Sequence, residues 1–122
     1  MKKILLIEDD ELMGKLYYDL LSQEKDFQVS LITDGKIAYN KIIENNWDLI
    51  LLDTLLPKMN ALDILNNLKK TNPEKLKQKI VIITNLDDGQ EIESIKSYNF
   101  EVINKSQLNP DQFLVKIKSY LI

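Results

Sequence analysis

Five short apolar runs alternate with segments of helical period along the chain, and this alternation limits the possible folds more than any other feature. The runs span residues 4–7, 29–32, 49–52, 80–83 and 102–103. The first, third and fourth runs are continuously apolar, which is typical of strands in the centre of a parallel sheet that is covered on both faces.

The segments between these runs space their apolar residues three or four positions apart, as amphipathic helices do. In the first segment two neighbouring columns predict one broad buried stripe, formed by Leu12, Met13, Leu16, Tyr17, Leu20 and Leu21. The later helices are predicted to bury Ala38, Tyr39, Ile42 and Ile43, then Leu62, Leu65 and Leu68, then Ile92 and Ile95, and finally Phe113, Ile117 and Leu121. Asn109 and Pro110 predict the N-cap and the first residue of the last helix.

Repeated strand–helix units favour an α/β fold, and right-handed crossovers place helices on both faces of a parallel sheet. We expect a flavodoxin-like (βα)5 doubly wound sandwich with strand order 2-1-3-4-5, formed by residues 1–122 as one domain. In such sheets the functional site lies at the carboxyl ends of the strands, next to the point where the strand order reverses.

Composition excludes several classes of function. The chain has no cysteine and no histidine, which excludes disulfides, zinc–thiolate sites and histidine chemistry within the chain. Its formal net charge of −3 argues against direct nucleic-acid binding. The apolar run near the N-terminus stops after four residues, too short for a signal peptide or a membrane span. We therefore expect a cytoplasmic protein with no membrane or nucleic-acid contact.

Polar side chains follow four of the predicted strands. Glu8, Asp9 and Asp10 come after the first strand and Asp53 after the third, while Thr84 and Lys105 come after the fourth and fifth. Each has an ordinary alternative explanation: Asp9 or Asp10 as a helix N-cap, Thr84 as a hydroxyl bonded to backbone, Lys105 as a solvated surface lysine. Their convergence on one edge of one sheet favours a functional site.

The charges of this group predict a cation. Two carboxylates about 4 Å apart repel each other by roughly 4 kcal/mol at an effective dielectric constant near 20. Gathering Glu8, Asp9 and Asp53 is therefore costly unless a cation lies among them. An all-oxygen ligand set suits Mg²⁺, and a carboxylate beside Mg²⁺ and a lysine is a candidate nucleophile for phosphoryl transfer.

Three stretches and one lysine resemble the response-regulator receiver domain of two-component systems. Residues 3–10 resemble the opening strand with its metal-binding acidic pair, and residues 48–57 the phosphoacceptor strand and its Leu-Pro turn. Residues 80–84 resemble the strand that ends in the switch threonine, and Lys105 the lysine after the fifth strand. The resemblance covers essentially the whole chain, with the motifs in the family's order.

The resemblance implies a role for each of these residues. Asp53 is the expected phosphoacceptor. Mg²⁺ is expected to bind Asp53, Asp9 and the Leu55 main-chain carbonyl, with Glu8 acting through a water. Thr84 is expected to hydrogen-bond a phosphoryl oxygen, and Lys105 to pair with another. Such a domain is a signalling switch, which catalyses only its own phosphotransfer and dephosphorylation.

The resemblance also implies partners. Because the chain has no histidine, the phosphoryl donor is expected to be a phosphohistidine of a histidine kinase or phosphotransfer protein. A downstream protein is expected to read the face formed by the fourth helix, fifth strand and fifth helix, after movement of Thr84 and the loop that follows it. We expect a stand-alone regulator that is a monomer or a weak homodimer.

Four residues depart from the family pattern. Ala61 stands where a glycine is usual, which predicts strain if that position has a positive φ. Ser106 replaces a proline after the lysine, which argues against a cis peptide there. Asn85 is larger than the usual residue, and Val102 replaces a common aromatic residue. These departures predict altered output rather than altered chemistry.

Two alternative functions remain. A phosphatase of the haloacid-dehalogenase type also uses a strand-end aspartate with Mg²⁺, but its second aspartate would fall at Leu55. A receiver-like module that binds partners without phosphorylation is the other alternative, although such modules usually lose the aspartate, the acidic pair or the lysine, all of which are present here.

Overall fold

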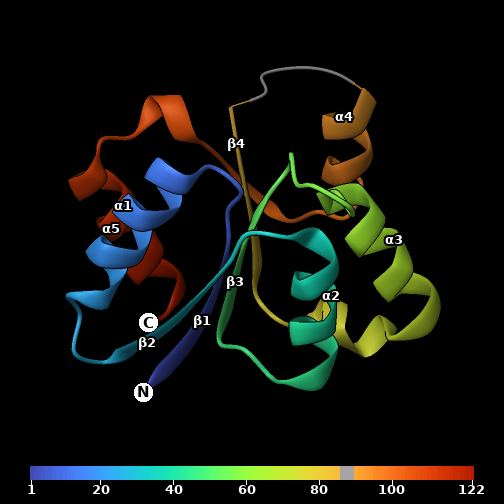
Figure 1. Cartoon of the computed structure of the whole chain (residues 1–122), viewed down its shortest axis with the longest axis horizontal. Helices are drawn as coiled ribbons and strands as arrows, with labels where there is room; N and C mark the ends of the chain where they lie inside the picture. Colours follow the sequence, from blue (N-terminus) through green and yellow to red (C-terminus); the bar gives the residue numbers. More distant parts are fainter. Residues whose placement is uncertain (86–89) are drawn as a thin grey trace.

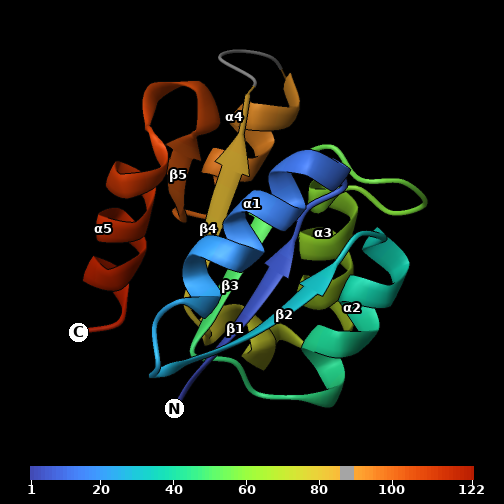
Figure 2. The same ribbon diagram turned by 60° about the vertical axis from the view of Figure 1, so that its left-hand side comes forward.

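The computed structural model describes residues 1–85 and 90–122 of the chain. The five predicted strands form one parallel sheet in the order β2-β1-β3-β4-β5, which confirms the predicted topology (Figure 2). Their bounds are Lys2–Ile7 for β1, Phe27–Ile32 for β2, Leu49–Asp53 for β3, Ile80–Thr84 for β4 and Glu101–Asn104 for β5. Each predicted run lies inside its strand, and every strand is one or two residues longer than its run.

Helices cover both faces of the sheet. Helices α1 and α5 lie on one face, and α2, α3 and α4 lie on the other (Figure 1). The helices are α1 (Glu11–Ser22), α2 (Gly35–Glu44), α3 (Ala61–Thr71), α4 (Gln90–Lys96) and α5 (Pro110–Tyr120), with short 3₁₀ turns η1 (Pro73–Lys77) and η2 (Lys105–Gln107). No helix in the described part of the chain is long and apolar enough to cross a membrane.

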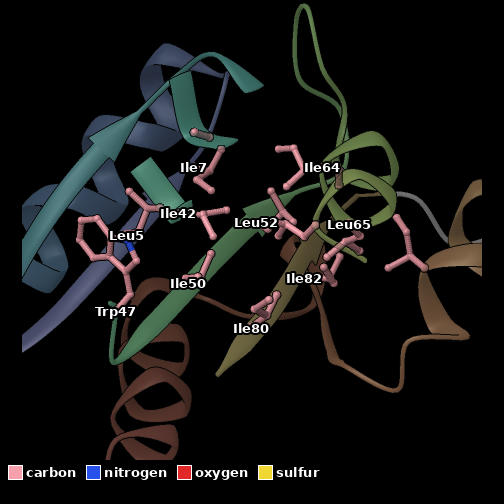
Figure 3. Packing of buried hydrophobic residues seen from close by; sticks show 14 residues of the cluster. Leu5, Ile7, Ile42, Trp47, Ile50, Leu52, Ile64, Leu65, Ile80 and Ile82 are labelled. Atoms are coloured by element: carbon pink, nitrogen blue, oxygen red, sulfur yellow. The ribbon is translucent and has the colours of Figure 1, made fainter. Parts of the chain in front are cut away.

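Each face of the sheet has its own hydrophobic core, because alternate residues of a strand point to opposite faces. On the α2–α4 face, Leu52 and Ile82 pack with Ile64 and Leu65 of α3 (Figure 3). On the α1/α5 face, Leu51 and Ile83 belong to a cluster that includes Tyr17 and Phe113, whose rings stack with centroids 4.2 Å apart. The strands β1, β3 and β4 are therefore buried on both faces, as their continuous apolar runs predict.

Helix α1 corrects one prediction. Leu12 is 82% exposed and Leu16 is 41% exposed, so they are not part of the buried stripe. The buried face of α1 is formed by Gly14, Tyr17 and Leu21 instead. Two adjacent apolar columns lie about 100° apart on a helix, and only the column that meets Phe113 of α5 and the sheet is covered.

Polar side chains cap the N-termini of α1, α2, α3 and α5. Asp10 accepts a hydrogen bond from the Met13 N–H (2.9 Å), so it is Asp10 rather than Asp9 that caps α1. Asn109 caps α5 with Pro110 at its first position, as predicted. Side chains of Asp34 and Asn60 likewise cap α2 and α3. These caps begin each helix immediately after the loop that leaves a strand.

The loop between β3 and α3 differs from the prediction in its backbone conformation and packs closely against α2. Ala61 is the first residue of α3 and has no positive φ, so the strain predicted for it is absent; the left-handed residue of this loop is Lys58, with φ 68°. Gly35 at the start of α2 packs directly under this loop: its N–H donates to the Pro57 carbonyl (3.2 Å), and a Cβ on it would lie 1.6 Å from the Met59 carbonyl oxygen. The Lys105–Ser106 peptide is trans, as the missing proline predicts.

The site at the carboxyl edge of the sheet

The sheet brings the predicted side chains to one edge. Asp53 is the last residue of β3 and Thr84 the last of β4, while Glu8 follows β1 directly and Lys105 follows β5. Parallel pairing places the ends of these strands side by side, with Asp53 opposite Ile83. The segment expected to move after β4, residues 86–89, lies outside the described residues.

Lys105 joins the two buried carboxylates. Its Nζ donates to Glu8 Oε1 at 2.6 Å and to Asp53 Oδ2 at 3.1 Å. Glu8 is fully buried and Asp53 is 6% exposed. Taking such charges out of water is costly, and it is tolerated here because the ammonium lies between the carboxylates. The sequence placed Lys105 at this edge, but it did not predict that Glu8 would be its nearest partner.

This arrangement shifts the protonation of its members. Burial, together with the hydrogen bond and charge of Asp53, raises the pKa of Glu8 to about 7, although Lys105 acts in the opposite direction. Burial alone would lower the pKa of Lys105, but its contacts with Glu8 and Asp53 outweigh that effect and raise it. Burial and the same two carboxylates raise the pKa of the neighbouring Tyr17 to about 12. The raised pKa values of Glu8 and Tyr17 therefore reflect burial first and the neighbouring carboxylates second.

A cavity of about 240 Å³ opens at this edge. Its lining comes from the ends of β1, β3 and β4 and from the residue after β5: Asp9, Asp10, Asp53, Thr54, Leu55, Asn85 and Lys105. Asp9 and Asp10 are exposed, so they face solvent at the mouth of the site. The Leu55 N–H lies 3.4 Å from Asp53 Oδ1, so the loop after β3 turns back over the carboxylate.

The oxygen atoms around the cavity suit Mg²⁺. No three acidic side chains among the described residues are close enough to enclose a metal by themselves. Mg²⁺ does not need such an enclosure, because it usually keeps several waters and binds only one or two carboxylates. Asp9 and Asp53 supply two carboxylates on one cavity, with Leu55 beside them. The residues present therefore fit the ion, with Glu8 engaged by Lys105 instead of facing the cavity.

The hydroxyl side chains occupy the other face of the sheet. Thr84 continues the row of Ile80 and Ile82, which faces α2–α4, whereas Asp53 continues the row of Leu51, which faces α1 and α5. Thr84 Oγ1 lies 3.0 Å from Thr54 Oγ1, and both residues are 1% exposed. Sequence reasoning missed Thr54. Only the register reveals it, because the pairing of Asp53 with Ile83 makes Thr54 the neighbour of Thr84.

Comparison with known proteins identifies the family of the chain. The family model described as the response regulator receiver domain matches residues 4–118. The response regulator ArlR of Staphylococcus saprophyticus is 27% identical over 121 residues, which cover 99% of this chain and 53% of that protein. The regulatory protein VanRB of Enterococcus faecalis is 32% identical over 88 residues, which cover 72% of this chain and 38% of that protein. The chain thus spans about half or less of these relatives.

Solved structures show the same fold. A CheY-like receiver domain protein from Methanospirillum hungatei superposes with a TM-score of 0.82 at 24% identity, covering 99% of this chain and 94% of that one. The BeF3-activated DrrB receiver domain superposes with a TM-score of 0.78 at 24% identity, covering 99% and 97%.

Receiver domains are the phosphoacceptor domains of two-component response regulators. As a family they act as signalling switches rather than as ordinary enzymes, they generally depend on Mg²⁺, and they interact with histidine kinases and downstream effectors. From the matched residues, the strand order and the site at the carboxyl edge, this chain belongs to the response regulator receiver domain family.

Proposed function

We propose that Asp53 is the residue of this receiver domain that accepts the phosphoryl group. The observation that carries the proposal is the buried contact of 3.1 Å between Asp53 Oδ2 and Lys105 Nζ beside an open cavity. A carboxylate oxygen of Asp53 attacks the phosphorus of a phosphohistidine, an O–P bond forms, the P–N bond breaks, and the imidazole leaves with the bonding electrons and takes up a proton. The donor is a partner protein, because the chain has no histidine.

Lys105 and the carboxylates prepare this step. Lys105 holds the Asp53 side chain in place and its positive charge offsets the charge that gathers on the phosphoryl oxygens. Asp9, Asp53 and the Leu55 main-chain carbonyl would hold Mg²⁺, whereas Glu8, which is not part of the cavity lining, would hold Lys105 in place. When bound, the ion supplies further neutralisation of phosphate charge. Three carboxylates, those of Asp9, Asp10 and Asp53, line the cavity with one lysine, and this acidic excess supports a cation requirement.

The output side of the proposal involves Thr84. Its hydroxyl would hydrogen-bond a phosphoryl oxygen on Asp53, and the change would reach a downstream protein through the face formed by α4, β5 and α5. Val102 of β5 is half-buried and packs against the core on the α2–α4 face. It carries no ring that could move inward, so we expect a smaller population shift than in relatives with an aromatic residue there.

Chemical phosphorylation tests the assignment. Acetyl phosphate with Mg²⁺ should add one phosphoryl mass to the protein, measured as intact mass, and Asp53→Asn should abolish the addition. Asp111→Asn, the same change at an exposed aspartate in the first turn of α5, is the matched control and should label normally. Labelling that persists in Asp53→Asn would place the phosphoacceptor elsewhere.

The same samples separate the alternatives. A wild-type protein that never gains mass would favour a module that binds partners without phosphorylation. Repeated turnover of a generic phosphate ester would favour a phosphatase instead. Labelling from ATP in the absence of any kinase would contradict the requirement for a donor in trans.

A further inference from the structure

Backbone hydrogen bonds fix the position of Thr54, whose hydroxyl pairs with that of Thr84. The Thr54 N–H donates to the Ile83 carbonyl at 3.3 Å, and the Thr54 carbonyl accepts from the Ala61 N–H at 3.4 Å. These backbone bonds tie Thr54 both to β4 and to the first residue of α3. Its hydroxyl therefore has a defined position 3.0 Å from the Thr84 hydroxyl, out of contact with water.

The pair lies on the side of the sheet away from the carboxylates. Thr84 shares the row of Ile82 on the α2–α4 face, while Asp53 points toward the α1/α5 face, where it meets Lys105. The contact with Thr54 thus holds the Thr84 side chain on the face opposite to Asp53. Either hydroxyl can be the donor, and in both cases a turn that carries Thr84 Oγ1 away from Thr54 toward Asp53 breaks the bond.

From this geometry we propose that Thr54 is a positioning residue that holds Thr84 in the resting state and thereby sets how readily the switch turns on. The inference rests on the proposed function, in which Thr84 binds a phosphoryl oxygen on Asp53. The exchange replaces the bond between the two threonines by a bond to the phosphoryl group. The bond to Thr54 exists in one state only, and such a differential contact shifts the equilibrium between states.

The size of the effect follows from the strength of one neutral hydrogen bond. Removing a bond present only in the resting state should raise the share of the active state about 3- to 10-fold, going by the usual net strength of such a bond. Thr54→Val keeps the shape of the side chain and removes only the hydroxyl. Thr54→Ser keeps the hydroxyl and should restore wild-type behaviour.

The first measurement needs neither metal nor phosphate. Three-bond couplings to the Thr84 methyl group report the χ1 rotamer of Thr84 in threonine-labelled protein by NMR. We expect one rotamer in the wild type and in Thr54→Ser, and rotamer averaging in Thr54→Val. In the wild type the rotamer should change on addition of beryllofluoride and Mg²⁺.

The second measurement is the rate of labelling by acetyl phosphate, expected to rise about 3- to 10-fold in Thr54→Val. Thr71→Val is the matched control, because Thr71 also makes a hydroxyl–hydroxyl bond, with Tyr39 at 2.8 Å, at the far end of α3. It should label at the wild-type rate. A control that rises equally would show a general loosening of the fold, which would overturn the proposal.

The outcomes separate this proposal from the proposed function. If the wild type is never labelled, the assignment of Asp53 fails, while the rotamer measurement still reports whether Thr54 holds Thr84. If the wild type is labelled but Thr54→Val equals it in both rotamer and rate, the role of Thr54 is wrong. A slower rate in Thr54→Val also overturns the proposal, because Thr54 would then assist Thr84 instead of restraining it. If Thr54→Val does not fold, the wild-type protein alone still tests the proposal: a Thr84 χ1 rotamer that stays unchanged when beryllofluoride binds would reject the role of Thr54.

Discussion

The two faces of the sheet end in different chemistry at the carboxyl edge. On the α1/α5 face the strands end in buried charges, Glu8 and Asp53, joined by Lys105. On the α2–α4 face they end in two neutral hydroxyls, those of Thr54 and Thr84, and in a loop packed on Gly35. Electrostatics dominates the charged side, whereas packing and one neutral hydrogen bond dominate the neutral side.

This division suggests how one edge of the sheet can combine a reactive group with a group that changes conformation in response. Charged contacts in a buried site are strong and respond steeply to any added charge, which suits phosphoryl transfer. A neutral hydrogen bond is worth only about 1 kcal/mol, so it can be exchanged with little cost. In the proposed function the charged side carries out the chemistry, and the hydroxyl side is suited to pass on its result.

Removing the shared cation should have the largest effect. Lys105→Met leaves Glu8 and Asp53 buried without their partner, and breaking such an ion pair costs about 3 to 5 kcal/mol. We expect urea unfolding to show a loss of this order in EDTA, together with loss of labelling by acetyl phosphate. Lys118→Met, which removes the exposed partner of Glu24, is the control and should change stability by less than about 1 kcal/mol. Equal losses in both variants would refute a special role for the charged side.

A methyl group on Gly35 tests the neutral side. In Gly35→Ala the new Cβ would lie 1.6 Å from the Met59 carbonyl oxygen, so the loop between β3 and α3 must move. We expect a loss of about 3 kcal/mol in the free energy of unfolding, since backbone cannot repack as a side chain can. Thermal and urea unfolding measure this loss. Wild-type stability in Gly35→Ala would mean that the loop is not held against α2.

The pH dependence of the metal-free protein tests the charged side more finely. The pKa of Glu8 is about 7 in the folded protein and 4.5 as its ordinary value, so the folded state binds the proton more tightly. The resulting stabilisation is complete below about pH 4.5 and is lost as the pH rises through about 7. In EDTA we expect Glu8 to lower stability by up to about 3 kcal/mol across this window.

Glu8→Gln removes this titration, so its stability should change less with pH over the same range. The comparison requires urea unfolding of both proteins at several pH values in EDTA. Parallel curves for Glu8→Gln and the wild type would show that Glu8 does not carry the raised pKa.

The smallest effect is expected at Gly14, in the buried face of α1. A Cβ there would make ordinary contacts of 3.5 Å with Glu8 and Leu31, and alanine favours a helix over glycine by about 1 kcal/mol. Gly14→Ala should therefore stabilise the protein by about 0.5 to 1 kcal/mol in urea unfolding. The change in the free energy of unfolding thus has opposite signs for Gly35→Ala and Gly14→Ala. Changes of the same sign would contradict the expected difference between the two faces.

Much of the fold was predictable because its signals are local. Continuous apolar runs identify β1, β3 and β4, and Asn109 with Pro110 identifies the start of α5. The buried side of α1 was not predictable in full, because two apolar columns compete and only the packing of Tyr17 on Phe113 decides between them. The conformation of the loop before α3 was also missed, since the left-handed residue is Lys58 and nothing in the sequence marks it.

The candidate site was predictable as a set of residues but not as a set of contacts. Strand order alone brings Asp53, Thr84 and Lys105 to one edge. Which carboxylate Lys105 prefers depends on side-chain depth, and fully buried Glu8 takes the shorter contact. Thr54 was missed because a single threonine after a strand has no distinctive pattern, and its importance comes from its register with β4.

The contact between Glu8 and Lys105 joins residues 97 positions apart, and this separation affects how the protein is made. A ribosome completes β1 and its acidic end long before it reaches the lysine that neutralises them. Until β5 is in place, docking β3 beside β1 brings Asp53 toward Glu8 with no ammonium between them. The residue that follows the last strand, Lys105, therefore relieves an electrostatic repulsion that arises when the earlier strands pair. Long-range contacts of this kind slow folding. Partly made chains are therefore expected to leave this edge open until Lys105 reaches Glu8 and Asp53.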